Sequence, residues 1–232
     1  MVFTERVEIE TSYGPARADI DGAAGPGTGP AFLLALTHGA GGGVDAPDLL
    51  AVRDAGLLLG AVVARITQPY RTRGARAPGD VGRQDAAWAE IIAALRRAIA
   101  PAAGLAELPL VQGGRSNGAR VACRTAEAVG AAAVIALAFP LCPPGRPEVS
   151  RAAELKITGR RVLVVNGERD PFGVPGRGAG RRVVVLPGET HALSRRPAAV
   201  GDAVTAWLPG VLGIARPAAR RQRQTRTNVT KK

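Results

Sequence analysis

Three polar residues have the types and the order along the chain that nucleophilic catalysis needs. Ser116 stands in the segment GRSNG, Asp170 in ERDPFG and His191 in PGETHAL. A serine hydroxyl becomes an effective nucleophile when a neutral imidazole takes its proton and a carboxylate orients that imidazole. The sequence therefore predicts Ser116 as the nucleophile, His191 as the base and Asp170 as the orienting acid.

The residues around Ser116 are typical of a tight turn between a strand and a helix. An apolar run precedes the serine, an alanine-rich run follows it, and Gly114 and Gly118 flank it at two residues on either side. In a G-x-S-x-G turn of this kind the strained backbone lifts the hydroxyl out of the sheet. The next N–H, at the start of a helix, can then stabilise a developing anion. An ordinary helix cap by Ser116 is the alternative.

Other residues could compete for these roles. His38 is the other of the two histidines in the chain. Glu168 lies close to Asp170 in the sequence, although strand alternation favours Asp170 as the acid. The glycine cluster at 39–43 resembles a nucleotide-binding loop. It lacks the Gly-Lys-Ser/Thr ending of a P-loop, and it lacks both the third glycine and the later acid of a dinucleotide fingerprint. We therefore expect no nucleotide cofactor.

The elements that must position these residues alternate along the chain. Strand-like apolar runs lie at 32–38, 61–66, 108–113, 132–139, 162–167 and 182–187. Helical patterns lie at 48–59, 83–100, 117–129, 147–155 and 197–208. This alternation predicts a three-layer α/β fold, with a mostly parallel sheet and helices on both faces. Ser116, Asp170 and His191 each follow a strand, so we expect them to meet at the edge of the sheet where the strands have their carboxyl ends.

The ends of the chain differ from this core. Residues 5–10 and 15–20 suggest an N-terminal hairpin, and 68–80 suggest a polar, basic loop. With 232 residues, 46% of them hydrophobic, the chain suits one domain over 1–212. A basic segment over 213–232 is expected to be disordered.

The net charge of +12 raises nucleic acid as a partner. Residues 216–232 contribute seven of the cations and no acid, and the sequence offers no stacking aromatics or known nucleic-acid motif. We expect solvated surface arginines and no specific nucleic-acid site, while weak binding of polyanions by the basic segment stays open.

The cysteines and apolar segments bear on location. Cys123 and Cys142 have neither metal-site nor CxxC spacing, so we expect free thiols and no metal. The N-terminus has no apolar leader, and the longest apolar stretch is too short to cross a bilayer. A cytoplasmic protein that acts on a small-molecule substrate, with no membrane partner, follows as the expectation. Its oligomeric state is left open.

Five segments together resemble a known superfamily: LTHGAGGGVDAPDL, GGRSNGARVA, FPLCPPGRPE, NGERDPFG and PGETHAL. They resemble the α/β hydrolases, and within them the small lidless dienelactone-hydrolase-like proteins of the KANL/Tex-like branch. The resemblance implies the same Ser-His-Asp triad, with the N–H groups of Ala40 and Asn117 as the oxyanion hole. It also implies that His38, next to Gly39, shapes the oxyanion loop. Asn117 stands where relatives usually carry Met, and Thr190 where Asp is frequent.

These residues predict a serine hydrolase of the carboxylesterase or thioesterase kind. Only 22 residues separate the strands that end at Phe139 and begin at Val162, which leaves no room for a lid domain. The site should therefore be open and accept small or exposed acyl groups. Arg71, Arg73 and Arg115 could attract an anionic substrate, with a solvated basic loop as the alternative for the first two. The rival class is a non-catalytic interaction scaffold of the same fold.

Overall fold

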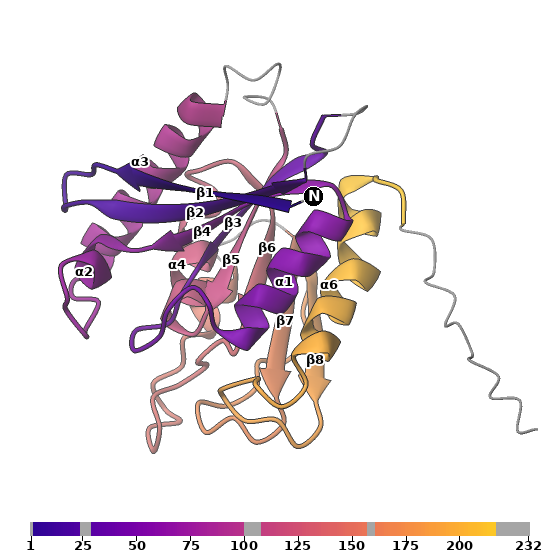
Figure 1. Cartoon of the computed structure of the whole chain (residues 1–232). Coiled ribbons are helices and arrows are strands. Elements are labelled where there is room, and N and C mark those ends of the chain that lie inside the picture. Colours follow the sequence, from indigo (N-terminus) through magenta and orange to yellow (C-terminus); the bar gives the residue numbers. More distant parts are fainter. Residues whose placement is uncertain (1, 24–28, 100–107, 157–160, 217–232) are drawn as a thin grey trace, which may run out of the picture.

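The protein forms one mixed sheet with helices on both faces. In the computed structural model, the described residues are 2–23, 29–99, 108–156 and 161–216. Within them, eight strands lie in the order β1-β2-β4-β3-β5-β6-β7-β8 (Figure 1). All neighbouring pairs from β4 to β8 are parallel, whereas β1 pairs with β2, and β2 with β4, in the antiparallel sense.

The strands and helices follow one another in the alternation that the sequence predicts. The strands are β1 (Val2–Ile9), β2 (Ala16–Ala23), β3 (Phe32–Thr37), β4 (Ala61–Thr67), β5 (Leu110–Arg115), β6 (Ala131–Leu137), β7 (Arg161–Gly167) and β8 (Arg181–Leu186). The helices are α1 (Pro47–Leu58), α2 (Pro69–Thr72), α3 (Val81–Ile99), α4 (Asn117–Thr125), α5 (Ala152–Lys156) and α6 (Pro197–Leu212).

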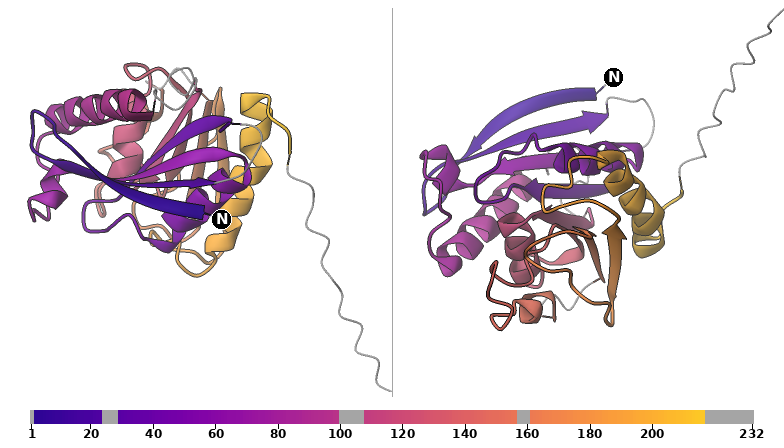
Figure 2. Two further views of the ribbon diagram at one scale, coloured as in Figure 1. Left: turned by 45° about the horizontal axis from the view of Figure 1, so that its top comes forward. Right: turned by 90° about the horizontal axis from the view of Figure 1, so that it is seen from below.

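Two hydrophobic cores lie on opposite faces of the sheet. Helices α1 and α6 lie side by side on one face, and α3 and α4 cover the other, as the views in Figures 1 and 2 show. Strand β3 contributes to both cores, because Leu33 and Ala35 face α3 and α4 while Leu34 and Leu36 face α1. Alternate burial on both faces explains why this strand appears in the sequence as a continuous apolar run.

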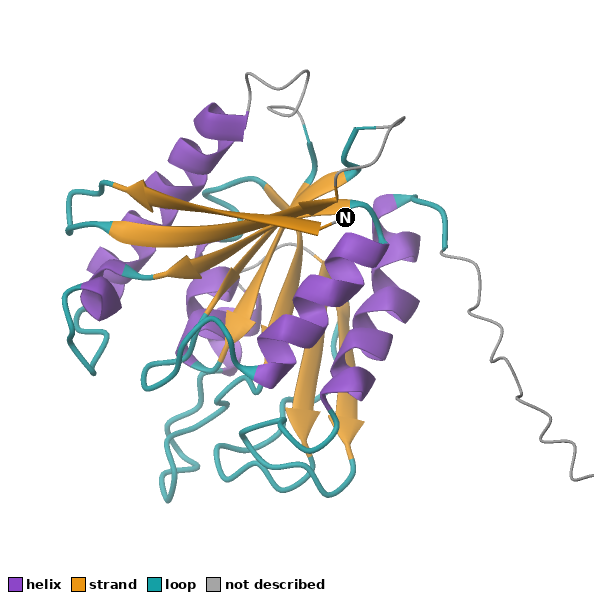
Figure 3. Cartoon of the chain, viewed as in Figure 1, coloured by secondary structure: helices purple, strands orange, loops and turns teal. Residues whose placement is uncertain are grey.

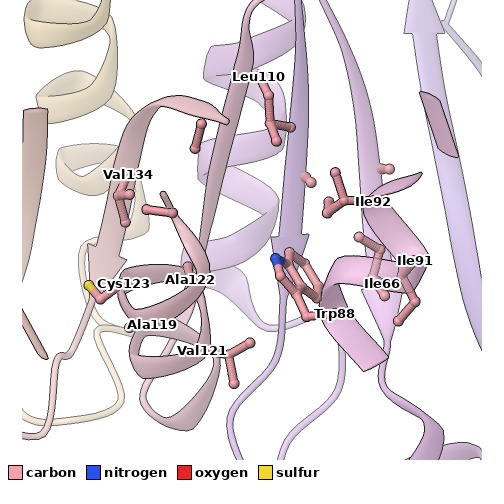
Figure 4. Packing of buried hydrophobic residues seen from close by; sticks show 14 of the residues in the cluster. Ile66, Trp88, Ile91, Ile92, Leu110, Ala119, Val121, Ala122, Cys123 and Val134 are labelled. Atoms are coloured by element: carbon pink, nitrogen blue, oxygen red, sulfur yellow. The ribbon is translucent and has the colours of Figure 1, made fainter. Parts of the chain in front are cut away.

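The core under α3 and α4 is built mainly from aliphatic side chains around one indole. Trp88 of α3 is 1% exposed and packs among the isoleucines and small residues seen in Figure 4. Its indole Nε1 donates a hydrogen bond of 2.7 Å to Oε1 of Gln112 on β5. The Gln112 amide in turn donates to the Ala122 carbonyl oxygen of α4 at 2.6 Å. A buried amide thus ties both helices to the strand that leads to Ser116.

The carboxyl ends of the parallel strands meet at one edge of the sheet. Figure 3 shows the loops that follow β6, β7 and β8 gathered at this edge. Residues 138–151 and 168–180 belong to these loops, and the region between β6 and β7 contains only the short helix α5 among its described residues. The prediction of an α/β sheet without a lid domain is confirmed, since no inserted domain covers this edge in the described residues.

Several local expectations were wrong. The helix expected over 147–155 begins only at Ala152, and the helix expected over 117–129 ends at Thr125. The polar segment 68–80 is not only a loop, because Pro69 begins the single-turn helix α2, where a proline at the first helical position costs no hydrogen bond. The last helix continues past the predicted end at 208, through Pro209, and ends at the left-handed Gly213. Most of the predicted basic segment, residues 217–232, lies outside the described residues. Among the described helices, none has both the length and the apolar character needed to cross a membrane.

Candidate active site

Ser116 occupies a strained turn between β5 and α4. Its backbone has φ of 53° and ψ of −113°, in a region that is costly for a residue with a Cβ. Its N–H donates to the Leu137 carbonyl oxygen of β6 at 2.9 Å, and its own carbonyl accepts from the Arg120 N–H at 3.2 Å. The turn is therefore held on both sides, and the serine does not cap the helix with its side chain. The strained turn between a strand and a helix that the glycine spacing predicts is therefore present.

The two flanking glycines are required by close backbone contact. A Cβ on Gly114 would lie 2.6 Å from the carbonyl carbon of Gly118, and a Cβ on Gly118 would lie 2.6 Å from the His38 carbonyl oxygen. Real Cβ atoms do not approach backbone this closely. The G-x-S-x-G spacing thus reflects the crossing of α4 over the ends of β3 and β5, as expected from the sequence.

The three predicted residues lie within hydrogen-bonding distance of one another. His191 Nε2 is 2.9 Å from Ser116 Oγ, and His191 Nδ1 is 2.9 and 3.0 Å from the two carboxylate oxygens of Asp170. The Asp170 carboxylate is fully buried, whereas the His191 side chain is 20% exposed. The structure therefore brings Ser116 together with Asp170 and His191, which follow it in the sequence by 54 and 75 positions.

The carboxylate of Asp170 is fixed by donors from its own loop. The Phe172 N–H donates to Oδ1 at 2.9 Å, and Asn166 Nδ2, from the end of β7, donates to Oδ2 at 3.1 Å. Asn166 also bonds both backbone polar groups of Phe139, at the end of β6. These donors hold the carboxylate in one orientation towards His191. Asp170 can therefore orient the imidazole.

The imidazole of His191 is held from a second side. The Phe172 ring lies against it, with the ring centroids 4.3 Å apart. Two residues further on, Leu193 is fully buried and adopts a φ of 48°. The buried leucine anchors the loop after β8, so that the imidazole stands at the mouth of the site with its Nε2 towards Ser116.

The turn at 39–42, the candidate oxyanion turn, lies directly beside Ser116. A Cβ on Gly39 would lie 3.2 Å from the Cβ of Ser116, which places the start of this turn against Ser116. The turn is closed by the Gly42 N–H, which donates to the Gly39 carbonyl oxygen at 3.2 Å. Ala40 belongs to this turn, and Asn117 begins α4, where first-turn N–H groups have no partner within the helix. Both residues therefore lie next to Ser116 in the structure, and their role as an oxyanion hole stays a prediction.

Comparison with known proteins agrees with this architecture. Residues 30–182, which make up more than half of the chain, match the family model described as the alpha/beta hydrolase domain. The chain belongs to the alpha/beta hydrolase family. A search of curated proteins found no match for this hydrolase-family chain.

Several solved structures share the fold of this alpha/beta hydrolase. A lidless serine hydrolase from Xanthomonas campestris superposes with a TM-score of 0.63 at 20% identity, covering 89% of this chain and 95% of its own. Dienelactone hydrolase from Anabaena variabilis gives 0.68 at 17% identity, covering 90% and 98%. Est1E from Butyrivibrio proteoclasticus gives 0.64 at 17% identity, covering 90% and 99%. Identities this low show the fold alone.

His38 of this alpha/beta hydrolase is a structural histidine at the start of the oxyanion turn. It is fully buried, its Nε2 accepts from the Gln68 N–H at 3.1 Å, and its Nδ1 lies 2.8 Å from the Gly39 carbonyl oxygen. These partners fit one neutral tautomer, with the proton on Nδ1. Burial lowers the pKa of His38, opposed by its bond to Gly39 and assisted by the nearby charge of Arg71. The neutral ring thus shapes the backbone next to Ala40.

The lowered pKa of His38 predicts a loss of stability in acid. Below its ordinary value of 6.5, the unfolded chain binds a proton that the folded protein resists, so the free energy of unfolding falls as the pH falls. We expect wild type to lose more stability than His38→Gln between about pH 8 and about pH 5.5. Urea unfolding of both proteins across this range measures the difference. If the free energy of unfolding depends on pH in the same way for both proteins, His38 is not a buried neutral imidazole.

Asn117 makes a contact that the sequence did not reveal. Its side-chain amide donates to Oε1 of Gln84 on α3 at 2.8 Å, and the Gln84 amide donates to the carbonyl oxygens of Gly79 and Asp80 at 3.1 Å. Asn117 is thereby tied to the segment that precedes α3. A buried polar pair between residues far apart in the sequence leaves no local signal in it.

A cavity of about 700 Å³ lies next to the oxyanion side of the site. Its lining includes Tyr13, Tyr70, Gln84 and Trp88. Two of these also reach the predicted oxyanion residues, because Gln84 bonds Asn117 and the Tyr70 hydroxyl lies 3.5 Å from the Ala40 carbonyl oxygen. Burial raises the pKa of Tyr70 to about 12, so its hydroxyl stays protonated. The cavity thus adjoins the neighbours of Ala40 and Asn117, although none of Ser116, Asp170 and His191 lines it.

The three arginines predicted as possible substrate contacts have different environments. Arg71 is half-buried, and its guanidinium lies 3.4 Å from the Ala75 carbonyl oxygen in its own loop. Arg73 is exposed, lies against Gly14 of the N-terminal hairpin and lines the cavity. Arg115 instead points toward Asp48 and the main chain of His191. Arg73 alone of the three borders the cavity, and Arg115 is engaged within the protein.

Proposed function

We propose that this protein is a serine hydrolase that cleaves small or exposed carboxylic esters or thioesters. The observation that carries the proposal is the continuous chain of contacts from Ser116 Oγ through the imidazole of His191 to the buried Asp170, with each distance close to 2.9 Å. A strained elbow serine with a base in reach is the arrangement that acyl transfer needs.

The proposed reaction proceeds through an acyl-enzyme. His191 takes the proton of Ser116 as Oγ attacks the substrate carbonyl carbon, and the N–H groups of Ala40 and Asn117 donate hydrogen bonds to the developing oxyanion. His191 then gives its proton to the leaving alcohol or thiol. Water, deprotonated by the same imidazole, attacks the acyl-enzyme, and the carboxylic acid leaves as Oγ regains its proton. Asp170 stabilises the imidazolium at each step.

We further propose a place within the superfamily. The motif set from 36 to 193 supports the small dienelactone-hydrolase-like proteins of the KANL/Tex-like branch. A cytoplasmic location is part of the proposal, supported by two free cysteines, of which Cys123 is buried and Cys142 partly so. Burial raises the pKa of the Cys123 thiol to about 12, which makes that cysteine inert and leaves Ser116 as the proposed nucleophile.

The substrate class predicts a preference for short acyl groups. Among the described residues no inserted domain covers the edge, and the adjoining cavity of about 700 Å³ could hold a compact group. We expect kcat/KM to be highest for short esters and to fall roughly tenfold or more for dodecanoyl esters. A series of p-nitrophenyl esters from acetyl to dodecanoyl measures this, with Ser116→Ala as the blank.

The outcome of the series separates the candidates. A steady increase in kcat/KM with chain length would contradict the proposal of small acyl substrates. Folded wild type that hydrolyses no ester of the series, hydrolyses no acetyl or dodecanoyl thioester run beside it, and reacts with no fluorophosphonate would favour the non-catalytic scaffold.

A further inference from the structure

Arg115 immediately precedes the proposed nucleophile and ends β5. Its side chain is only 18% exposed, although it stands at the carboxyl edge of the sheet where the loops are open. Its guanidinium lies over the oxyanion turn, with Nη1 3.7 Å and 3.9 Å from the places that a Cβ would occupy on Gly39 and Gly42. The arginine is therefore packed inward.

One partner of Arg115 is a buried carboxylate. Asp48, in the first turn of α1, has a fully buried side chain, and its Oδ2 lies 3.0 Å from Arg115 Nε. The two atoms form an ion pair rather than a well-aligned hydrogen bond. The other carboxylate oxygen accepts from the Leu49 N–H at 3.0 Å. Burial raises the pKa of Asp48, and the charge of Arg115 opposes that rise. Asp48 thus holds the guanidinium in one orientation.

The second partner of Arg115 is the main chain of the proposed base. Arg115 Nη2 donates to the His191 carbonyl oxygen at 2.9 Å, across 76 residues of sequence. The same residue, His191, presents its imidazole to Ser116 Oγ, next in the chain to Arg115. The guanidinium therefore connects the backbone on both sides of the Ser116–His191 hydrogen bond.

We propose that Arg115 is a positioning residue that fixes the backbone of His191 relative to Ser116, with Asp48 holding the guanidinium in place. The inference rests on the proposed function, because it assigns a role to Arg115 in that same site. It is an alternative to the expectation that Arg115 binds an anionic substrate, since Nε and Nη2 both contact groups of the protein itself. A displacement of a catalytic group by about 1 Å can lower the rate about 10²-fold.

The chemistry requires an arginine rather than any cation. A planar guanidinium presents donors in two directions from one rigid group, so that it can face the Asp48 carboxylate with Nε and the His191 carbonyl with Nη2. A lysine ammonium at the same place would be a point charge on a flexible stem. Lysine should pair with Asp48 but hold His191 poorly.

The test compares four variants with wild type. Arg115→Gln removes the contact but leaves the Asp48 carboxylate buried and unpaired, which threatens folding. The double variant Asp48→Asn/Arg115→Gln removes that charge as well, and Arg115→Lys keeps the charge. Arg161→Gln, an exposed arginine at the amino end of β7, is the matched control. The measurements are kcat and KM for a neutral ester and for one that carries a carboxylate, per folded molecule.

The positioning role predicts a fall in kcat of about 10²-fold in the double variant, with KM nearly unchanged for both esters. Arg115→Lys should recover folding and only part of kcat, and Arg161→Gln should resemble wild type. A double variant with wild-type kcat would overturn the proposal. So would a selective rise in KM for the carboxylate-bearing ester, which would assign Arg115 to substrate binding.

A spectroscopic measurement tests the proposal without any substrate. The chain has two histidines, so nitrogen-15 NMR of the imidazoles gives two sets of signals. We expect the His191 signals of the double variant to shift or broaden, while those of His38 stay in place. Unchanged His191 signals would overturn the positioning role even if wild type hydrolyses nothing, whereas inactive wild type with shifted His191 signals would count against the proposed function alone.

Discussion

Replacing Ser116 by alanine is expected to lower kcat for ester hydrolysis roughly 10⁶-fold, because the proposed mechanism has no other nucleophile. The turn should persist, since the Ser116 N–H donates to the Leu137 carbonyl oxygen and the Ser116 carbonyl accepts from the Arg120 N–H, and alanine adds no atom to the turn. The variant should therefore fold as wild type does. Initial rates on a short p-nitrophenyl ester, together with a thermal melt of both proteins, measure the two expectations.

A serine on the same loop as the base serves as the control for Ser116. Ser194 is exposed and three residues from His191, so Ser194→Ala should keep the wild-type rate. If Ser116→Ala keeps more than a small fraction of the wild-type activity, hydrolysis does not pass through this hydroxyl. The proposed acyl-enzyme would then be wrong, whatever the fold.

Replacing Asp170 by asparagine is expected to lower kcat about 10⁴-fold by changing the tautomer of His191. Phe172 N–H and Asn166 Nδ2 both donate to the native carboxylate, so asparagine will place its oxygen towards one of them. Its amide N–H₂ can then donate to His191 Nδ1, which moves the ring proton to Nε2. An Nε2 that carries a proton cannot accept one from Ser116. Steady-state kinetics measure the loss, and imidazole NMR reports the tautomer.

The matched control for Asp170 is an exposed acid on another face. Asp202, exposed on α6, should tolerate Asp202→Asn without a change in kcat. An Asp170→Asn loss below about tenfold would contradict the proposed role of the carboxylate. Retention of the wild-type tautomer, with the proton on Nδ1, would contradict the physical reason given for it.

The elements that the sequence predicted well are those marked by an unbroken run of apolar residues. Strands buried on both faces appear as unbroken apolar runs, so that β3 and β7 were located to within a residue or so. Ser116 could be assigned because the glycine spacing reports a backbone contact, which is a local property of the chain. Asp170 and His191 could be proposed because parallel strands bring their carboxyl ends to one edge.

The remaining features depend on which strands are neighbours. The alternation of strands and helices along the chain does not reveal that β4 lies between β2 and β3 in the sheet. It therefore does not predict that Gln68, after β4, contacts His38, after β3. The same is true of Gln84 beside Asn117 and of Arg115 beside the His191 carbonyl, which are polar pairs between distant segments. The short helix α2 was missed because one helical turn leaves no periodic pattern in a polar segment.

The most direct test of the central claim is the site at which an active-site inhibitor bonds to the wild-type protein. After reaction with a fluorophosphonate, intact-mass measurement should find one adduct per chain, and peptide mapping should place it on Ser116. Nucleophilicity at this hydroxyl requires the imidazole of His191 within reach, as the 2.9 Å contact provides. A folded wild-type protein that gains no adduct, or gains it at a residue other than Ser116, would contradict the proposed hydrolase.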